Sequence, residues 1–488
     1  MKLMSFNDFK AAVRPPCRIP LVGEIPMDLD TPLSLFKSLP TSTHNFLLES
    51  VEGGEKWGRY SLLGLNPSVV FTSQGKKVCL TEGKKKTVYE AQDPFEELKK
   101  VLTKYPYVTL PDLPRFSGGA VGWISYDSVR FFEKIPATSK KKSKVADLCF
   151  MIPEILLIAD NFQQTLKIVY DARIEKASSI KSVYEKGCQK IQEVVKKLER
   201  RVANQKKQKK SSLSLKWISN ISEKEHEKMV EKAREYIFAG DITQAVLSLQ
   251  FRAKVKVDPL FLYRSLRRIN PSPYMYLLQM GATSLVGASP ETMVHLEKGQ
   301  MTLRPIAGTR PRGKTDAEDQ VLAKELLADQ KERAEHIMLV DLGRNDLGRV
   351  AKSGTVRVDE LMIVEKYSHV MHMVSNVRAA LAPGKDAFDV LRATFPAGTL
   401  SGSPKIRAME IIEELESTRR GVYGGCVGYF SFSGNMDMAI TIRSALLHEG
   451  TLFVQAGSGI VADSKPAMEY QECLNKAKAM MQAVKQCS

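Results

Sequence analysis

The stretch QAGSGIVADSKPAMEYQECLNKA, residues 455–477, joins a predicted strand to the last predicted helix of the chain. The apolar run over 452–456 favours a strand, and Gly457-Ser458-Gly459 after it predicts a glycine-rich turn. Such a turn can offer backbone N–H groups to a carboxylate or phosphate, although a purely structural turn is more common. Pro466 suits the first turn of a helix that continues to about Lys485.

Acidic side chains are paired on two predicted helices. Glu469 and Glu472 are three residues apart on the last helix, and Glu332 and Glu335 repeat this spacing on an earlier one. The spacing places each pair on one helix face. Two such faces in contact would form an oxygen-rich site suited to Mg²⁺, but the same spacing is common on exposed helices. Lys476, one turn beyond Glu472, could pair with that glutamate or with a substrate carboxylate.

The carboxy-terminal half alternates predicted helices and strands. A capping box over 222–225 (Ser-x-x-Glu) predicts a helix that Gly240 ends, and a strand follows over 243–251. A second capping pattern over 315–318 (Thr-x-x-Glu) predicts one long helix to about Val340.

The amino-terminal half contains predicted strands, among them a hairpin of 156–160 with 165–170. The segment ERRVANQKKQKKSSLS, residues 199–214, is polar and has no apolar periodicity, which is typical of a linker. A chain of 488 residues is expected to form more than one domain. We therefore predict an amino-terminal region, 1–200, a Lys/Ser-rich linker, 201–216, and a carboxy-terminal region, 217–488.

Two glycine-rich segments resemble each other, GGAVGWIS at 118–125 and GGCVGYFS at 424–431. Both segments predict glycine-rich strands that another backbone passes closely. Their likeness fits either an internal duplication or chance. The surroundings of Cys426 superficially resemble the nucleophile turn of a class I glutaminase. However, Phe430 stands where a glutamine is expected, so we interpret Cys426 as a buried strand residue. The chain is therefore not expected to release ammonia itself.

The net charge is +17, and much of the excess lies in lysine runs at 84–86, 140–144 and 206–210. These runs lack interleaved aromatic residues, so solvated loops are favoured over a nucleic-acid surface. The remaining positive field can help to collect an anionic substrate. No apolar stretch is long enough for a membrane span, and no signal peptide is expected. Seven cysteines without a CxxC pair favour a reduced cytoplasm.

Long motifs then connect the chain to a known family. They are AEHIMLVDLGRNDLGRV (334–350), EKYSHVMHMVSNVR (365–378), TFPAGTLSGSPKIRAMEIIEELE (394–416), YGGCVGYFSFSGNMDMAITIRSAL (423–446) and the stretch 455–477. From about Pro20 to Gln482 the sequence resembles the chorismate-utilising enzymes, and among them the component I family of anthranilate synthases. The resemblance implies an α+β fold with two large, mostly antiparallel sheets packed face to face and helices outside.

The resemblance also assigns roles to the acidic residues. Glu335 and Glu472 match the family's Mg²⁺ ligands, and Glu332 and Glu469 match supporting or ligand positions. Glu291 matches the general acid near the leaving C4 hydroxyl of chorismate, and His372 matches the histidine of the elimination step. Positions that hold the substrate's carboxylates and hydroxyl are matched by Gly308, Thr309, Thr399, Tyr423, Arg443, Gly457, Gly459 and Lys476.

Two positions separate the members of this family. Members that add water carry a basic lysine where this chain has Gln244, and many aminodeoxychorismate synthases carry a nucleophilic lysine where it has Ala307. Both differences favour direct attack of ammonia at C2, which gives anthranilate and pyruvate. The rival within the family is aminodeoxychorismate synthase component I of the folate branch. A basic nucleic-acid-binding protein on a degenerate enzyme fold is the rival from another class, and the intact acidic residues and Arg443 argue against it.

The resemblance implies regulation and a partner as well. A tryptophan-sensing pocket is expected, although a pocket that merely holds the sheets together is the alternative. There is one departure, because after Ser248 this chain has Leu249-Gln250-Phe251, where relatives tend to have a basic residue. A separate glutaminase subunit would supply ammonia in a cytoplasmic hetero-oligomer. The residues matched to the tryptophan pocket are Leu48, Glu49, Ser50, Arg59, Pro271, Tyr274 and Met275.

Overall fold

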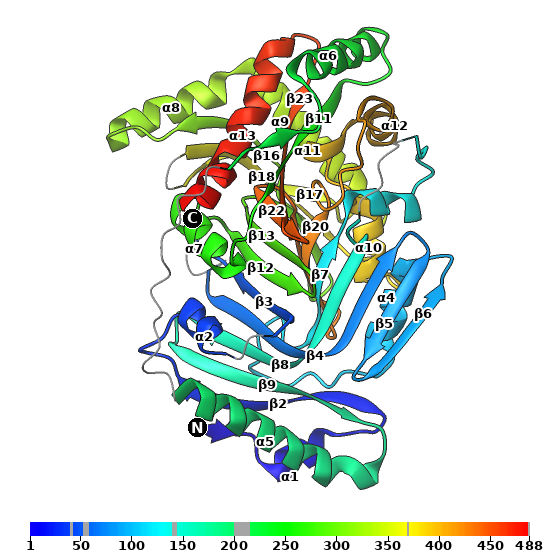
Figure 1. Cartoon of the computed structure of the whole chain (residues 1–488), viewed down its shortest axis with the longest axis vertical. Helices are drawn as coiled ribbons and strands as arrows, with labels where there is room; N and C mark the ends of the chain where they lie inside the picture. The colour runs from blue at the N-terminus through cyan, green and yellow to red at the C-terminus, as the bar shows by residue number, and fades with distance from the viewer. Residues whose placement is uncertain (40–41, 52–57, 139–143, 200–214, 368–369, 487–488) are drawn as a thin grey trace.

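Two long strands, β4 (Tyr60–Gln74) and β8 (Leu148–Asp160), organise the fold in the computed structural model of the chain (Figure 1). The structure describes residues 1–488 except 40–41, 52–57, 139–143, 200–214, 368–369 and 487–488. The two strands pair antiparallel, with one register shift between Pro67 and Val69. Each strand continues from one sheet into another, so both sheets belong to one hydrogen-bonded network.

The first sheet contains the first half of β4 and the second half of β8. Its strands pair antiparallel in the order β10-β11-β23-β22-β13-β12-β3-β4-β8-β9-β2-β1, and β19 also pairs with β11. Their bounds are β1 Lys2–Leu3, β2 Cys17–Pro26, β3 His44–Glu49, β9 Thr165–Ile174, β10 Ile218–Ser219, β11 Gln244–Lys254, β12 Tyr274–Met280, β13 Thr283–Ser289, β19 Gly402–Ser403, β22 Ser444–His448 and β23 Thr451–Ile460.

The second sheet contains the other halves of β4 and β8. Its antiparallel order is β6-β5-β4-β8-β7-β20-β21-β14-β15-β18, and β16 and β17 also pair with β18. Their bounds are β5 Lys77–Glu82, β6 Lys85–Glu90, β7 Gly119–Ile124, β14 Thr292–Glu297, β15 Gln300–Leu303, β16 Ile306–Pro311, β17 Arg357–Lys366, β18 Val370–Ala380, β20 Cys426–Ser431 and β21 Met436–Ile440.

An apolar layer fills the space between the two sheets. Trp123 of β7 and Tyr429 of β20 meet Tyr276 of β12 and Leu285 of β13 there, and all four are buried. The predicted arrangement of two mostly antiparallel sheets packed face to face is therefore confirmed. The structure adds that hydrogen bonds connect the two sheets through β4 and β8.

Helices cover the outer faces, as predicted. Those packed on the first sheet are α1 (Phe6–Ala12), α2 (Pro32–Ser38), α5 (Ile180–Glu199), α6 (Glu223–Phe238), α7 (Pro259–Ile269) and α13 (Pro466–Gln486). Those packed around the second are α4 (Pro94–Thr103), η1 (Tyr126–Phe131), α9 (Gln330–Gly348) and α10 (Ala387–Thr394), with α8 (Asp316–Ala328) against β16. The helices α11 (Gly398–Ser401) and α12 (Lys405–Leu415) contact β11 and β19 of the first sheet and also reach the core of the second, and η2 (Ala177–Ser179) precedes α5.

The predicted hairpin and capping box are present in the structure, whereas one predicted helix is divided into two. The hairpin of β8 and β9 is confirmed, with Asp160 opposite Thr165, and both halves of the capping box at Ser222 are present. The single helix predicted from 315 to about Val340 is wrong. Asp329 ends α8, and its side chain accepts hydrogen bonds from the first backbone N–H groups of α9. An aspartate inside a helical pattern can begin a new helix because its carboxylate satisfies those donors.

The two similar glycine-rich segments lie side by side. They form β7 and β20, which pair with Gly122 opposite Gly428. A Cβ atom at Gly122 would lie 1.9 Å from the Cys149 carbonyl oxygen, so only glycine fits this approach. Cys426 is fully buried in β20, as predicted.

Both sheets contain strands from both halves of the chain. In the first sheet β3 pairs with β12, and in the second β7 pairs with β20. The predicted regions 1–200 and 217–488 therefore share their sheets. The predicted linker, 201–216, lies outside the described residues except for its last two positions.

The lysine run at 84–86 is exposed at the turn between β5 and β6, while the runs at 140–144 and 206–210 lie almost entirely outside the described residues. No helix in the described part of the chain is both long enough and apolar enough to cross a bilayer.

Candidate functional site

A cavity of about 520 Å³ is lined by residues of α9, α13, β11 and β23, and the last two strands form its floor. Figure 1 shows where these four elements lie. This volume is typical of small-molecule sites. The residues predicted for catalysis, for substrate binding and for the metal, His372 excepted, all line it. They are Gln244, Glu291, Gly308, Thr309, Glu332, Glu335, Thr399, Tyr423, Arg443, Gly457, Gly459, Glu469, Glu472 and Lys476.

The floor of the cavity corrects one prediction. Gly457-Ser458-Gly459 is not a turn, because it lies inside β23 and pairs with Val246 to Ser248 of β11. A Cβ atom at Gly457 would lie 2.9 Å from the Tyr423 hydroxyl, and one at Gly459 would lie 2.4 Å from Nε2 of Gln244. The glycines therefore make room for two side chains of the cavity, as strand glycines often do.

Glu291 stands between β13 and β14 with its carboxyl group held in place. Its Oε2 accepts a hydrogen bond from Thr399 Oγ1 at 3.0 Å, and its backbone oxygen accepts one from Ile440 at 3.0 Å. Burial raises the pKa of Glu291, although Thr399, Lys476 and Arg443 oppose the shift. A carboxyl with a raised pKa keeps its proton to higher pH, which suits a general acid.

Two pairs of glutamates face the cavity from α9 and α13. Burial and the neighbouring Glu332 raise the pKa of Glu335, while a hydrogen bond from Gln244 opposes this. On α13, Glu472 pairs with Lys476 at 2.6 Å. Oε2 of Glu469 is buried without a hydrogen-bond partner. Carboxylate oxygens are the ligands that hard cations prefer, so this set of side chains is chemically suited to one.

Within the described residues, no three acidic, histidine or cysteine side chains converge closely enough to hold a metal ion. The donor set still fits Mg²⁺, because it consists of carboxylate oxygens, one of them buried and unsatisfied.

The cationic side of the cavity is formed by Arg443 and Lys476. Arg443 adopts a positive φ of 50°, a conformation uncommon outside glycine, and its Nη1 donates to the backbone oxygen of Lys476 at 3.1 Å. Burial lowers the pKa of Arg443, whereas Glu291, Tyr423 and Glu472 oppose that effect. Lys476 Nζ also contacts the Gly457 backbone oxygen at 3.1 Å. Two cationic groups at one end of a cavity can bind an anionic substrate.

His372 does not line the cavity but lies directly behind its wall. Its Nδ1 is 3.0 Å from the backbone oxygen of Gly308 and 3.1 Å from Thr309 Oγ1. Burial lowers the pKa of His372, which favours the neutral ring. The histidine therefore reaches the cavity through Thr309, because β18 places it opposite Thr309 of β16.

A second pocket lies between the two sheets, and five of the residues matched to the tryptophan pocket line it: Leu48, Glu49, Ser50, Tyr274 and Met275. Arg59 and Pro271 are not among its lining residues. Arg59 instead pairs with Asp160, and Pro273 stands at the wall. The prediction missed the residues that the second sheet contributes, because pairing partners distant in sequence bring them here. They include Arg115, Tyr429 and Asp437.

Sequence reasoning also missed several residues of the main cavity. Val246 follows Gln244 on the same face of β11, so strand alternation could have found it. Lys331 precedes Glu332 at the start of α9, and Gln455 precedes the strand glycines. Leu400 follows Thr399, and local sequence gives no signal for it.

The chain is similar to known proteins in both sequence and fold. The profile of the chorismate binding enzyme family matches residues 44–482. Anthranilate synthase component 1 of Aquifex aeolicus is 48% identical over 468 residues, covering 96% of this chain and 94% of that relative. The crystal structure of anthranilate synthase component I from Streptococcus pneumoniae has a TM-score of 0.76 and 37% identity, over 93% of this chain and 98% of that one. The menaquinone-specific isochorismate synthase of Escherichia coli shares the fold, with a TM-score of 0.71 at 19% identity over 98% of both chains.

Proposed function

Since this chain belongs to the chorismate-binding enzyme family, among relatives that are anthranilate synthase component 1, we propose that it converts chorismate and ammonia into anthranilate and pyruvate. The observation that carries the proposal is the environment of Glu291. Burial raises the pKa of this carboxyl, and it faces the same cavity as Arg443 and Lys476. An acid with a raised pKa in a cavity that also holds cationic groups suits a dianionic substrate that must lose a hydroxyl.

The reaction has two steps. Glu291 donates its proton to the C4 hydroxyl, which leaves as water, while ammonia forms a bond to C2. The ammonium group formed at C2 loses a proton, which gives aminodeoxyisochorismate. A base then removes the remaining proton from C2 while the C3–O bond breaks, and the enolpyruvate that leaves takes up a proton to become pyruvate as the ring becomes aromatic. Thr399 orients the Glu291 carboxyl, and Arg443 and Lys476 bind the substrate carboxylates. His372 acts in the second step from behind Thr309.

Two side chains favour anthranilate over related products. Ala307 of β16 is 7% exposed and offers no nucleophile, so ammonia attacks C2 directly. Gln244 is a neutral amide that hydrogen-bonds Glu335, and it cannot deprotonate water. Both features disfavour the 4-amino and hydrated products.

The reaction is proposed to depend on Mg²⁺ held by Glu335 and Glu472, with Glu332 and Glu469 in support. Bound there, the ion would neutralise one carboxylate of the substrate. Lys476 has two possible partners. It pairs with Glu472 at 2.6 Å, and it also lines the cavity that receives the substrate carboxylates. Release of Glu472 would leave Lys476 available to the substrate.

Ammonia is proposed to come from a separate glutaminase subunit in a cytoplasmic hetero-oligomer. The second pocket is proposed to bind L-tryptophan as a feedback inhibitor. Its lining supports an amino acid ligand, because Glu49 and Asp437 are acidic and Arg115 is basic around an apolar centre. The two carboxylates suit an ammonium group, and the guanidinium suits a carboxylate.

The test is anthranilate fluorescence from the purified chain with chorismate, Mg²⁺ and ammonium at alkaline pH, with and without tryptophan. We expect a signal that requires Mg²⁺ and that tryptophan suppresses. A 4-amino product would contradict the argument from Ala307. Intact chorismate would contradict the proposed reaction itself.

A further inference from the structure

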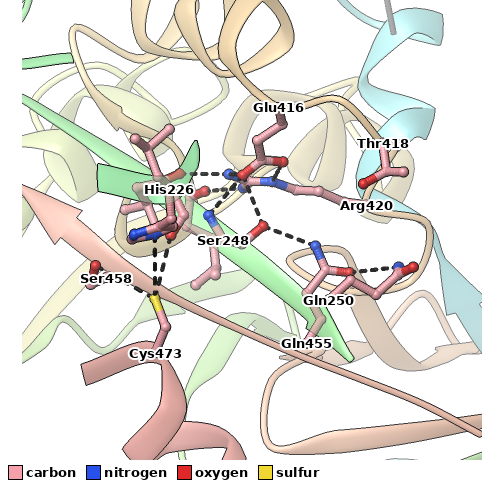
Figure 2. Close-up of polar contacts among 12 residues, drawn as sticks. His226, Ser248, Gln250, Glu416, Thr418, Arg420, Gln455, Ser458 and Cys473 are labelled. Carbon is pink, nitrogen blue, oxygen red and sulfur yellow. Dashed lines mark hydrogen bonds and ion pairs between the residues drawn. The ribbon is translucent and has the colours of Figure 1, made fainter. Parts of the chain in front are cut away.

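A buried ion pair lies directly behind the wall of the main cavity (Figure 2). Arg420 is 3% exposed and Glu416 is 7% exposed, and the guanidinium donates to both carboxylate oxygens at 2.9 and 2.7 Å. Removing two charges from water is costly, and apolar side chains of similar volume often stabilise a fold equally well. Stability alone therefore gives little reason for this pair, and its other contacts indicate what it does.

Two further N–H groups of Arg420 donate to backbone oxygens of the cavity wall. Nη1 donates to the Leu400 backbone oxygen at 2.6 Å, and Nη2 donates to the Val246 backbone oxygen at 2.5 Å. Leu400 and Val246 both line the cavity, but their carbonyls are directed at the buried guanidinium. Two partial negative charges are thereby turned away from a cavity that receives a dianion. Leu400 also follows Thr399, the residue that orients Glu291.

Glu416 controls a second part of the wall through Ser248. Its Oε1 accepts hydrogen bonds from the Ser248 backbone N–H at 2.9 Å and from the hydroxyl at 2.8 Å. Because a carboxylate only accepts, the hydroxyl of Ser248 must donate to it. The Ser248 oxygen then accepts from Gln455 Nε2 at 2.9 Å, and Gln455 Oε1 accepts from Gln250 at 3.1 Å. One carboxylate therefore sets the direction of a chain of hydrogen bonds that continues through Gln455, a residue of the cavity floor, to Gln250 (Figure 2).

We propose that Glu416 and Arg420 are positioning residues of the substrate cavity. The pair holds the backbone at Val246 and Leu400 and fixes the amide of Gln455, so that the wall is ordered before chorismate binds. This inference rests on the proposed function, because it concerns the same cavity and substrate. Ordering of this kind matters for rate, since a displacement of about 1 Å can reduce it by about 10²-fold.

The chain offers a matched control near the end of α12, three residues before Glu416. Glu413 is 9% exposed and pairs with Arg130 at 2.5 Å. Arg130 also donates to Asp127 and to the Pro136 backbone oxygen, and neither residue lines the cavity. Glu413→Gln therefore weakens a comparable buried pair without touching the cavity wall.

The experiment compares Glu416→Gln with Glu413→Gln by thermal unfolding, by calorimetric binding of chorismate and by ammonia-dependent kinetics. We expect the Tm of both variants to fall by a similar amount. Only Glu416→Gln is expected to raise the Kd and KM for chorismate by about tenfold and to lower kcat. Equal Kd, KM and kcat in the two variants would overturn the proposal. If the native chain binds chorismate but forms no anthranilate, the proposed reaction fails, and the Kd comparison still tests the positioning role.

A second variant covers the case in which Glu416→Gln does not fold. Ser248→Ala keeps the ion pair and removes only the hydroxyl between Glu416 and Gln455. We expect a rise of a few-fold in the Kd for chorismate with little change in Tm. An unchanged Kd would contradict the link from Glu416 to the cavity floor. Arg420→Lys keeps the positive charge but loses the guanidinium fork, so we expect the KM for chorismate in this variant to stay above the native value.

Discussion

Glu291 combines a chemical advantage with a cost to folding. Burial raises its pKa above the unfolded value, so its contribution to stability is present below the unfolded pKa and is lost as pH rises through the folded pKa. We expect Glu291→Gln to lower kcat by about 10²–10⁴-fold, while its Tm at alkaline pH equals or exceeds that of the native chain. Kinetics and melting curves from pH 5 to 9 measure both effects.

Two outcomes would count against this account of Glu291. A variant that keeps native kcat would show that another group donates the proton. A variant with a lower Tm at alkaline pH would show that the ionised carboxyl stabilises the fold there.

At Gly459 a side chain would collide with a neighbouring residue of the cavity. A Cβ atom would lie 2.4 Å from Nε2 of Gln244, which hydrogen-bonds Glu335. We expect Gly459→Ala to displace this amide and to lower kcat/KM by about tenfold. Gly348→Ala is the matched control, because nothing lies within 4 Å of its Cβ position and its φ is not positive. Equal kcat/KM in both variants would contradict the steric argument.

At the scale of elements, the break at Asp329 decides where the α9 glutamates point. The Asp329 carboxylate accepts from the backbone N–H groups of Lys331 and Glu332 at 3.1 and 3.2 Å. Asp329→Ala removes this cap, so we expect Tm to fall by a few degrees and the Mg²⁺ concentration for half-maximal activity to rise about tenfold. Asp329→Asn retains a capping oxygen and serves as the control. An unchanged Mg²⁺ requirement in Asp329→Ala would separate the cap from the metal site.

The same break illustrates what local sequence could and could not predict. The i, i+3 spacing correctly placed Glu332 with Glu335 and Glu469 with Glu472 on single helix faces, because that geometry is local. Sequence pattern did not reveal the break, since residues on both sides of Asp329 favour helix. It also assigned Gly457 to Gly459 to a turn, because their role in β23 depends on Tyr423 and Gln244, which come from distant segments. The family resemblance, rather than periodicity, brought the four glutamates into one predicted site.

At the scale of the whole molecule, the second pocket connects the two sheets. Leu48 and Met275 belong to the first sheet, and Tyr429 and Asp437 belong to the second. A ligand that binds only the folded chain raises its apparent stability with ligand concentration. We expect L-tryptophan to raise Tm progressively, and Glu49→Gln to weaken the effect, because Glu49 offers a carboxylate to the amino group. Thermal shift with L-tryptophan and with its decarboxylated analogue measures this, and an unchanged Tm with L-tryptophan would contradict binding in the pocket.

The shared sheets make a final prediction about the two halves of the chain. A fragment of residues 215–488 leaves β12 without β3 and β20 without β7 and exposes Tyr276 and Tyr429, which are buried in the chain. Unpaired strand edges and exposed apolar surface favour aggregation over folding. We therefore expect the fragment alone to lack a cooperative melt and chorismate binding, and co-production with residues 1–199 to restore both. The control is the full chain cut by a protease at an inserted site within 205–210, which should stay folded because both sheets hold its halves together. A fragment that melts cooperatively and binds chorismate alone would show that the apolar layer between the sheets is not required for folding.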